Sequence, residues 1–323
     1  MASLLVIGGS GFFGKSILDA YKRDLLSPWN IDRIEVVARK ASNLANSNPE
    51  LMSKNVFLHD LDITSCTYLP VADYVIHAAA STDAKNYLSK PEEEKKNIQL
   101  GTANFCTLAE QFLKNSKILY ASSGAVYGQQ PVTMSQVDES YELQDLTTLD
   151  PGKRDYAAAK RDGERYIQAL GDKGFDVAIA RCFAFVGLYL PRDQHFAIGN
   201  FIEDGLRGRP ISVNAKHAVY RSYLYVDDLV SWLMTICAKS TPKCPIVNVG
   251  ADEAILIGDL AKRVGNAFGV NANVPQLTSQ TVDHYAPAIT KALEMGCKQP
   301  FSLNEAINKT IHAINTNNEF KTP

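Results

Sequence analysis

The chain has 323 residues, of which 46% are hydrophobic and 21% charged, and its formal net charge at pH 7 is −2. This balance excludes the strongly basic surface that binds nucleic acid or an anionic membrane, and no stretch reaches the roughly 20 apolar residues of a membrane helix. The six cysteines are scattered, without a CxxC pair or metal-ligand spacing. They predict reduced thiols, a cytoplasmic location and no bound metal.

Short apolar runs alternate with helical patterns through the first half of the chain. This alternation predicts an α/β fold, a doubly wound parallel sheet with helices on both faces. The expected strands are residues 4–7, 34–38, 55–58, 74–77, 118–122 and 177–181. The expected helices are residues 11–21, 91–113, 155–170, 226–238 and 257–268.

A glycine-rich loop follows the first expected strand directly, with Gly8, Gly11 and Gly14 spaced as GxxGxxG around Phe12 and Phe13. The first glycine permits a tight turn, the second a close approach of the backbone to phosphate, and the third close packing of helix on strand. The loop therefore predicts a Rossmann-type site, with the pyrophosphate of a dinucleotide at a helix N-terminus.

The end of the second expected strand carries Arg39 where an acidic residue would mark NAD. A guanidinium can bind the 2′-phosphate of NADP(H) through paired hydrogen bonds. We therefore expect NADP(H) as the preferred cofactor, with NAD as the alternative if Arg39 only begins a solvated loop.

Two further strand ends offer cofactor contacts. Asp60 and Leu61 follow the third strand and are expected to hold the adenine, although Asp60 could be a simple turn residue. The small residues Ala78, Ala79 and Ala80 follow the fourth strand and would let the backbone approach the nicotinamide ribose.

Ser123, Tyr156 and Lys160 form the candidate catalytic set. Tyr156 and Lys160 are four residues apart and share one face of the expected helix. An ammonium about 4 Å from the phenol would lower its pKa by about three units at an effective dielectric near 20. Ser123 leaves the fifth strand and can hydrogen-bond the substrate oxygen. The set predicts hydride and proton exchange at a carbinol or ketone.

These motifs resemble the extended short-chain dehydrogenase/reductase family, which includes nucleotide-sugar epimerases, dehydratases and ketoreductases. The resemblance extends over nearly the whole chain, through Asn97, Arg181-Cys182-Phe183, Asn200-Phe201 and residues 221–228. It implies a nucleotide-diphosphate sugar as substrate and a homodimer formed by the helices around 97–113 and 155–170. It also implies a dinucleotide-binding domain at 1–180, completed by part of 220–250, and a mainly substrate-binding domain at 181–323.

The resemblance implies further site residues. Asn97 would lie at the cofactor, and Asn200 and Arg221 would face the diphosphate, which an arginine can clasp through two oxygens. His195 is either a sugar contact or a histidine of a solvated loop.

The chain departs from the family next to Ser123. Dehydratases carry two acidic residues there, and the fucose-synthase group carries a cysteine, whereas this chain has Gly124 and Ala125. Ala184 replaces an asparagine that contacts the sugar nucleotide in many members. These departures leave chemistry that needs only hydride transfer and one proton.

Three functions remain open. The first is NADPH-dependent reduction of a 4-keto nucleotide-diphosphate sugar, which Arg39 favours. The second is NAD-dependent C4 epimerisation of such a sugar. The third is a non-catalytic NADP-binding sensor, which the intact Ser123, Tyr156 and Lys160 set disfavours.

Overall fold

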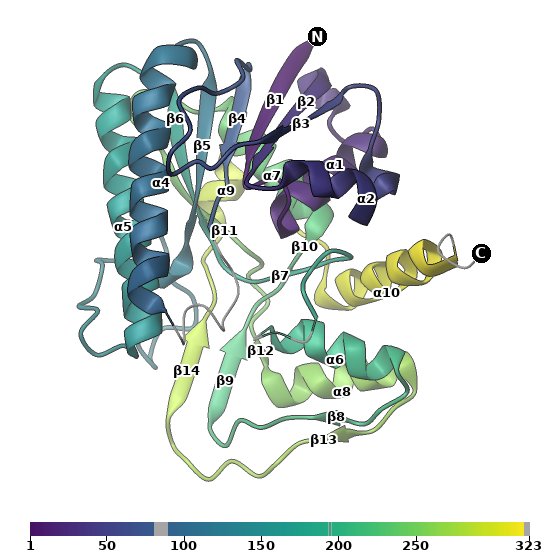
Figure 1. Ribbon diagram of the computed structural model, residues 1–323. Coiled ribbons are helices and arrows are strands. Elements are labelled where there is room, and N and C mark those ends of the chain that lie inside the picture. Colours follow the sequence, from purple (N-terminus) through teal and green to yellow (C-terminus); the bar gives the residue numbers. More distant parts are fainter. Residues whose placement is uncertain (81–89, 193, 195, 320–323) are drawn as a thin grey trace.

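The large sheet has seven parallel strands, with β1 near its centre (Figure 1). The structure is a computed structural model that describes residues 1–80, 90–192, 194 and 196–319. The strand order is β3-β2-β1-β4-β5-β6-β11, so the direction of winding reverses between β1 and β4. The strands are β1 (Ala2–Ile7), β2 (Ile31–Ala38), β3 (Val56–Asp60), β4 (Tyr74–His77), β5 (Lys117–Ser123), β6 (Val177–Cys182) and β11 (Ile246–Val249). In open α/β sheets the crevice at such a reversal is the ligand site.

Helices cover both faces of this sheet, which confirms the predicted doubly wound α/β fold. The long helices α4 and α5 lie side by side on one face, and α1 and α7 cover the other (Figure 1). Their bounds are α1 (Phe12–Lys22), α4 (Pro91–Phe112), α5 (Pro151–Asp172) and α7 (Val226–Ala238), with the short α2 (Leu44–Ser47) and α9 (Thr290–Glu294) nearby. None of the helices in the described residues combines the length and hydrophobicity that a membrane-spanning segment requires.

The first strand illustrates how the core is divided. Successive side chains of a strand point to opposite faces of the sheet. Leu5 and Ile7 accordingly join the core cluster that contains Phe105 of α4. Leu4 and Val6 join the cluster on the opposite face. A strand buried on both sides reads as a continuous apolar run, which is why it could be predicted from the sequence.

The six expected strands are all present, and two differences from expectation have local causes. The four-residue β11 is an additional strand that pairs with β6 in parallel, and its run is too short to be separated from a loop by pattern alone. Helix α5 begins at Pro151, four residues before the expected start. Its N-cap, Asp150, is extended (φ −53°, ψ 144°), and proline is favoured at the first position of a helix.

The later residues build a smaller layer beneath the carboxyl ends of the large sheet (Figure 1). Its centre is a three-stranded sheet of order β12-β9-β14, against which α8 packs, and α6 packs on α8. The elements are β9 (Ala218–Arg221), β12 (Ile255–Leu256), β14 (Val282–Tyr285), α6 (Ala197–Leu206), α8 (Ile257–Phe268) and α10 (Leu303–Glu319). Two short pairs accompany them, β7 (Phe185–Val186) with β10 (Leu224–Tyr225) and β8 (Ile211–Ser212) with β13 (Ala272–Asn273).

The chain returns to the large sheet after it has begun the smaller layer. Helix α7 contacts β4, β5 and β6, and α9 contacts β11. The large layer is therefore built from segments that precede and follow residue 180 in the sequence.

Candidate functional site

A cavity of about 1090 Å³ separates the glycine loop from the smaller layer. Its walls come from the start of α1, the ends of β4, β5 and β6, the first turns of α5, and residues of β9 and β14. Eleven of the predicted site residues line it: Gly8, Gly11, Phe12, Phe13, Ala78, Ala80, Ser123, Tyr156, Lys160, Asn200 and Arg221. The cavity thus brings together residues from both halves of the sequence.

The glycine loop has the geometry that the spacing predicts. Gly8 has φ +85°, a conformation that other residues rarely adopt, and a Cβ there would lie 2.7 Å from the Ala79 Cα. A Cβ on Gly14 would lie 2.0 Å from the Gly9 carbonyl oxygen. Helix α1 begins at Phe12. Its N-cap residue is Gly11, so no N-cap side chain caps the first N–H groups of the helix. Its first N–H groups suit a phosphate, so the loop fits the pyrophosphate of a dinucleotide.

The predicted adenosine contacts lie outside the cavity. Arg39 is exposed just after β2. Asp60 accepts hydrogen bonds from the Ser42 backbone N–H (2.8 Å) and the Ser42 Oγ (2.6 Å), and these bonds lower the pKa of its carboxyl. Leu61 follows it. These bonds are typical of a turn residue, the alternative left open above, and a contact of Asp60 with the adenine stays a prediction.

Asn97 is also not brought to the cavity. It lies exposed on α4, whereas the neighbouring Ile98 turns inward and is 3% exposed. The helix thus presents Ile98, Gly101 and Thr102 to the protein interior. His195 lies outside the described residues.

The predicted catalytic residues meet on one wall of the cavity. Ser123 ends β5, and its Oγ accepts a hydrogen bond from the Ala125 N–H at 3.2 Å. A side-chain hydrogen bond also joins Ser123 to Tyr156. Lys160, 3% exposed, donates from Nζ to the Ala121 carbonyl oxygen at 2.8 Å, and its Nζ is 5.9 Å from the centre of the Tyr156 ring.

Burial, rather than Lys160, dominates the protonation of Tyr156. Although part of Tyr156 faces the cavity, the surrounding protein removes most of its hydration and raises the pKa of the phenol, which the Ser123 hydrogen bond lowers only in part. Burial outweighs any lowering by the Lys160 ammonium, so the expectation of a net decrease in this pKa was wrong. The ammonium is itself desolvated, which lowers the pKa of Lys160 to about 8. The resting site therefore holds a protonated phenol.

A buried ion pair lies behind this wall. Arg181 of β6 binds Glu164 of α5, with 2.7 Å between Nη2 and Oε2, and Ser122 donates to the same carboxylate at 2.6 Å. Both charged side chains are 5% exposed. A pair with this many hydrogen bonds is costly to break, so it ties α5 to β5 and β6 and fixes the helix that carries Tyr156 and Lys160.

Phe183 occupies the space beside Ser123 where family members carry acids or a cysteine. A Cβ on Gly124 would lie 2.7 Å from two carbons of the Phe183 ring. Phe183 is 8% exposed and packs near Tyr285, with 4.7 Å between ring centroids. A side chain at position 124 would therefore have to displace the Phe183 ring.

Two residues of β14 are absent from the sequence predictions: Tyr285, which lines the cavity, and Asp283, which contacts the cavity residue Arg221. The hydroxyl of Tyr285 lies 3.4 Å from the Ser123 Oγ, and burial raises its pKa to about 12. Asp283 forms an ion pair with Arg221, with 2.7 Å between Oδ2 and Nη2. Neither belongs to a motif. The only available signal was the alternation of residues 282–285 in a short apparent strand.

Asn200 and Arg221 both reach the cavity from the smaller layer. Asn200 donates from Nδ2 to the Gln194 carbonyl oxygen at 2.6 Å, and its buried Oδ1 has no hydrogen-bond partner among the described residues. Such an orphaned oxygen can accept a bond from a ligand. Arg221 also donates to the Tyr220 carbonyl oxygen at 2.8 Å.

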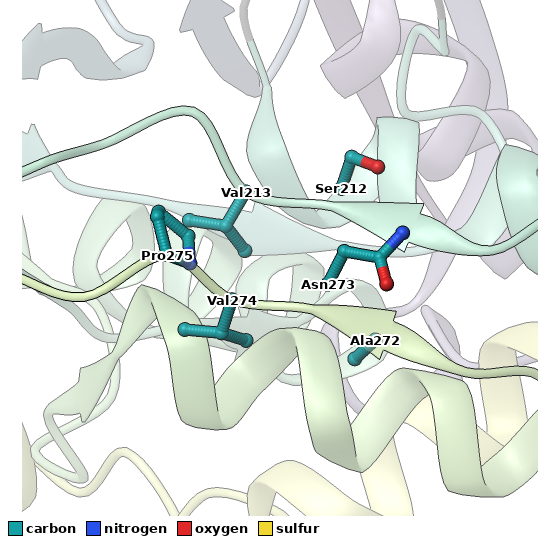
Figure 2. A pocket seen from close by; sticks show the side chains of 6 residues that line it. All are labelled: Ser212, Val213, Ala272, Asn273, Val274 and Pro275. Atoms are coloured by element: carbon teal, nitrogen blue, oxygen red, sulfur yellow. The ribbon is translucent and has the colours of Figure 1, made fainter.

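A second, open hollow of about 560 Å³ lies between β8 and β13 (Figure 2). Figure 2 shows its lining of Ser212, Val213, Ala272, Asn273, Val274 and Pro275. Ser212 and Val213 line the main cavity as well. The hollow carries no ionisable side chain, so it offers no chemistry of its own.

The remaining polar clusters in the described residues do not form a metal centre. No group of three or more His, Cys, Asp or Glu side chains there is placed to hold a metal ion. All six cysteines lie in the described part and are free thiols.

Comparisons with known proteins agree with this architecture. UDP-glucuronic acid decarboxylase 1 of Xenopus tropicalis is 28% identical over 313 residues, which cover 96% of this chain and 71% of that protein. The solved UDP-N-acetylglucosamine 4-epimerase from Methanobrevibacter ruminantium M1, in complex with UDP-N-acetylmuramic acid, superposes with a TM-score of 0.80 at 20% identity, covering 98% and 99% of the two chains. The UDP-glucose 4-epimerase of Thermotoga maritima, solved with UDP-glucose, gives a TM-score of 0.77 at 20% identity over 98% and 99%.

The sequence model of the NAD dependent epimerase/dehydratase family matches residues 4–250. This match covers the glycine loop, the wall with Ser123, Tyr156 and Lys160, and the two residues of the smaller layer, Asn200 and Arg221. The chain therefore belongs to the NAD dependent epimerase/dehydratase family of enzymes.

Proposed function

We propose that the protein is an NADPH-dependent reductase of a 4-keto nucleotide-diphosphate sugar. The observation that carries this proposal is the composition of the cavity wall formed by Ser123, Tyr156 and Lys160, called the catalytic wall below. Ser123, Tyr156 and Lys160 can transfer one proton, and Phe183 fills the space where a further acid or base would stand. Such a wall suits a reaction that consists of one hydride and one proton.

The protonation states favour the reducing direction. NADPH would supply the hydride. Ser123 would donate a hydrogen bond to the ketone oxygen, and Tyr156 would give its proton to that oxygen as negative charge develops there. Because burial raises the pKa of Tyr156, the phenol holds the proton that a reduction consumes. The Lys160 ammonium, near the phenol ring, would stabilise the phenolate that is left.

Arg39 supports NADP(H) rather than NAD as the cofactor of this reaction. Its exposed side chain follows β2 directly, two residues after Val37, whose carbonyl oxygen accepts a hydrogen bond from the Gly9 N–H at 3.3 Å. A 2′-phosphate at this end of the glycine loop would meet a cation, while a carboxylate that would bind the ribose 2′-hydroxyl of NAD is not at this position.

The nucleotide part of the substrate is supported by the relatives and by Arg221. Both solved relatives described above are named as UDP-sugar 4-epimerases, and the decarboxylase acts on UDP-glucuronic acid by its name. Arg221 and Asn200 both line the cavity, and the buried Asn200 Oδ1 has no hydrogen-bond partner among the described residues. A diphosphate held there would orient the sugar C4 toward the nicotinamide through binding energy remote from the reaction.

C4 epimerisation with bound NAD is the second candidate, because two solved relatives that match over 98% of this chain are 4-epimerases. It would use the same residues, with Tyr156 first accepting and then returning the proton.

The experiment that separates the two candidates is an assay of the purified protein with a UDP- or dTDP-linked 4-keto sugar and NADPH. We expect NADPH to be oxidised, the free keto sugar to react very poorly, and Tyr156→Phe to lower turnover about a hundredfold or more while NADPH still binds. The proposal is wrong if NADPH is not consumed while the protein, carrying NAD, interconverts UDP-glucose and UDP-galactose.

A further inference from the structure

Arg221 already has an anionic partner in the cavity wall. Its Nη2 lies 2.7 Å from the Asp283 Oδ2, and its Nη1 donates to the carbonyl oxygens of Asp283 (3.2 Å) and Tyr220 (2.8 Å). The guanidinium is thus bonded at both terminal nitrogens. Asp283 belongs to none of the sequence motifs, and the ion pair lies outside the catalytic wall.

Asp283 does not itself line the cavity, but it lies on the same face of β14 as the cavity residue Tyr285. Strands β9 and β14 run parallel, with Asp283 opposite Val219 and Tyr285 opposite Arg221. Val219, Arg221 and Tyr285 all line the cavity, and alternate residues of a strand share one face. The side chains of Arg221 and Asp283 are 24% and 36% exposed, so the pair is open to a ligand.

The pair changes the electrostatics of the expected diphosphate site. Arg221 and Asp283 together carry no net charge, so the arginine attracts an anion less than a lone guanidinium would. An anion that hydrogen-bonds Arg221 would lie roughly 5–7 Å from the Asp283 carboxylate, given ordinary hydrogen-bond lengths. At that separation two negative charges repel each other appreciably in a partly buried site.

We propose that Asp283 is a specificity- and affinity-determining residue, a counter-ion that competes with the diphosphate of the ligand for Arg221. This inference rests on the proposed function, in which Arg221 binds that diphosphate. In the ligand-free site Asp283 holds Arg221 in place and neutralises it. On binding, the guanidinium turns from the carboxylate to the phosphates, and on release the carboxylate recaptures it. Asp283 therefore lowers the affinity for the nucleotide and speeds its departure.

The test compares nucleotide binding by wild type, Asp283→Asn and Asp283→Ser, measured by calorimetry on protein saturated with NADP⁺. The probes are uridine, UMP and UDP, with dTDP in parallel. We expect removal of the carboxylate to tighten UDP binding about tenfold, because one repulsive charge is lost, to tighten UMP binding less, and to leave uridine binding unchanged. Asp259→Asn is the matched control, since Asp259 pairs with Lys262 on the surface of α8.

Arg221→Ala distinguishes failure of this inference from failure of the proposed function. If UDP binds wild type and Arg221→Ala weakens it, but Asp283→Asn and Asp283→Ser bind UDP no more tightly than wild type, the competition proposal is wrong and the proposed function stands. An equal gain for uridine and UDP also overturns it, because a neutral probe feels no charge repulsion. If Arg221→Ala leaves UDP binding unchanged, the diphosphate role of Arg221 is wrong. In the background of Arg221→Ala, we expect the gain from Asp283→Asn to shrink, because the competition for Arg221 is gone and only direct charge repulsion remains.

Discussion

At the scale of single residues, burial decides which groups of the catalytic wall carry charge. The Tyr156 phenol is desolvated and its pKa rises, while the Lys160 ammonium is desolvated and its pKa falls to about 8. Both shifts favour the neutral form, as burial does for acids and bases alike. The wall therefore has a proton donor that stays protonated and an ammonium that titrates within the range where enzymes are assayed.

The pH dependence of the reaction follows from Lys160. The ammonium is present below its pKa of about 8 and is lost as the pH rises through that value. We expect kcat for ketone reduction to be level below the pKa and to fall about tenfold per pH unit well above it, since an essential charge is removed. The measurement is a pH profile of kcat at constant ionic strength, with Lys160→Arg, which does not titrate, as the control. A wild-type profile that stays level to about pH 9.5 would contradict this role of Lys160.

Cofactor preference is also decided by one residue. Replacing Arg39 by Ala should weaken NADPH binding by about 1.5–3 kcal/mol, the loss of charged hydrogen bonds to the 2′-phosphate, and leave NADH binding unchanged. Lys40→Ala is the matched control, because Lys40 is an exposed neighbour of the same sign. Fluorescence titrations with both cofactors measure the effect. Equal losses for NADPH and NADH in Arg39→Ala would mean that the residue does not contact the 2′-phosphate.

At the scale of secondary-structure elements, glycines set how closely the helices approach the sheet. Gly163 of α5 lies over Tyr120 of β5, and a Cβ there would lie 2.2 Å from the Tyr120 Oη. Tyr120 is 1% exposed and cannot move aside freely. The close approach keeps Tyr156 and Lys160, on the same helix, at the height of Ser123.

This contact predicts a difference between two similar substitutions. Gly163→Ala should lower the free energy of unfolding by about 1–3 kcal/mol, because overpacking outweighs the gain in helix propensity. Gly101→Ala on α4 is the control, since its Cβ would meet the Ile63 Cγ2 at 3.1 Å and the Thr64 Cγ2 at 3.7 Å, both ends of side chains. Urea unfolding measures both. Equal stability of the two variants would show that α5 can shift away from β5 at little cost.

At the scale of the whole molecule, the candidate site lies between two layers that are interleaved in the sequence. The large layer supplies the glycine loop and the catalytic wall, and the smaller layer supplies Asn200, Arg221 and β14. Helices α4 and α5 lie on the outside of the large layer, away from the smaller one (Figure 1). They remain the predicted dimer surface, and each carries an exposed large apolar side chain, Leu100 on α4 and Tyr166 on α5.

The predicted dimer can be tested through these two residues. The double variant Leu100→Glu and Tyr166→Glu should convert the dimer to a monomer, because it places like charges from both copies in an apolar interface. Light scattering after gel filtration measures the mass. The control is Leu25→Glu and Val71→Glu, two exposed apolar positions elsewhere. A wild-type protein that is monomeric at all concentrations would rule out the homodimer.

Much of the fold and part of the site could be predicted because their causes are local. A buried strand such as Leu4–Ile7 reads as an apolar run, and the glycines after it are required where the chain turns tightly and packs closely. Tyr156 and Lys160 share a helix face by spacing alone. These features need only neighbours within a few residues, so the fold class, the glycine loop and the catalytic wall are determined by the sequence itself.

The tertiary structure alone decided what depends on residues far apart in the chain. Asp283 meets Arg221 and Tyr285 meets Ser123 only because β14 pairs with β9 at the cavity. Phe183 fills the space at Gly124, and Asn97 turns to the surface while Ile98 turns inward. The pKa of Tyr156 rises because the folded protein removes water from the phenol. This desolvation outweighs the lowering that the four-residue spacing to Lys160 led us to expect. Desolvation and contacts between distant strands arise only when the chain is folded, and no local pattern records them.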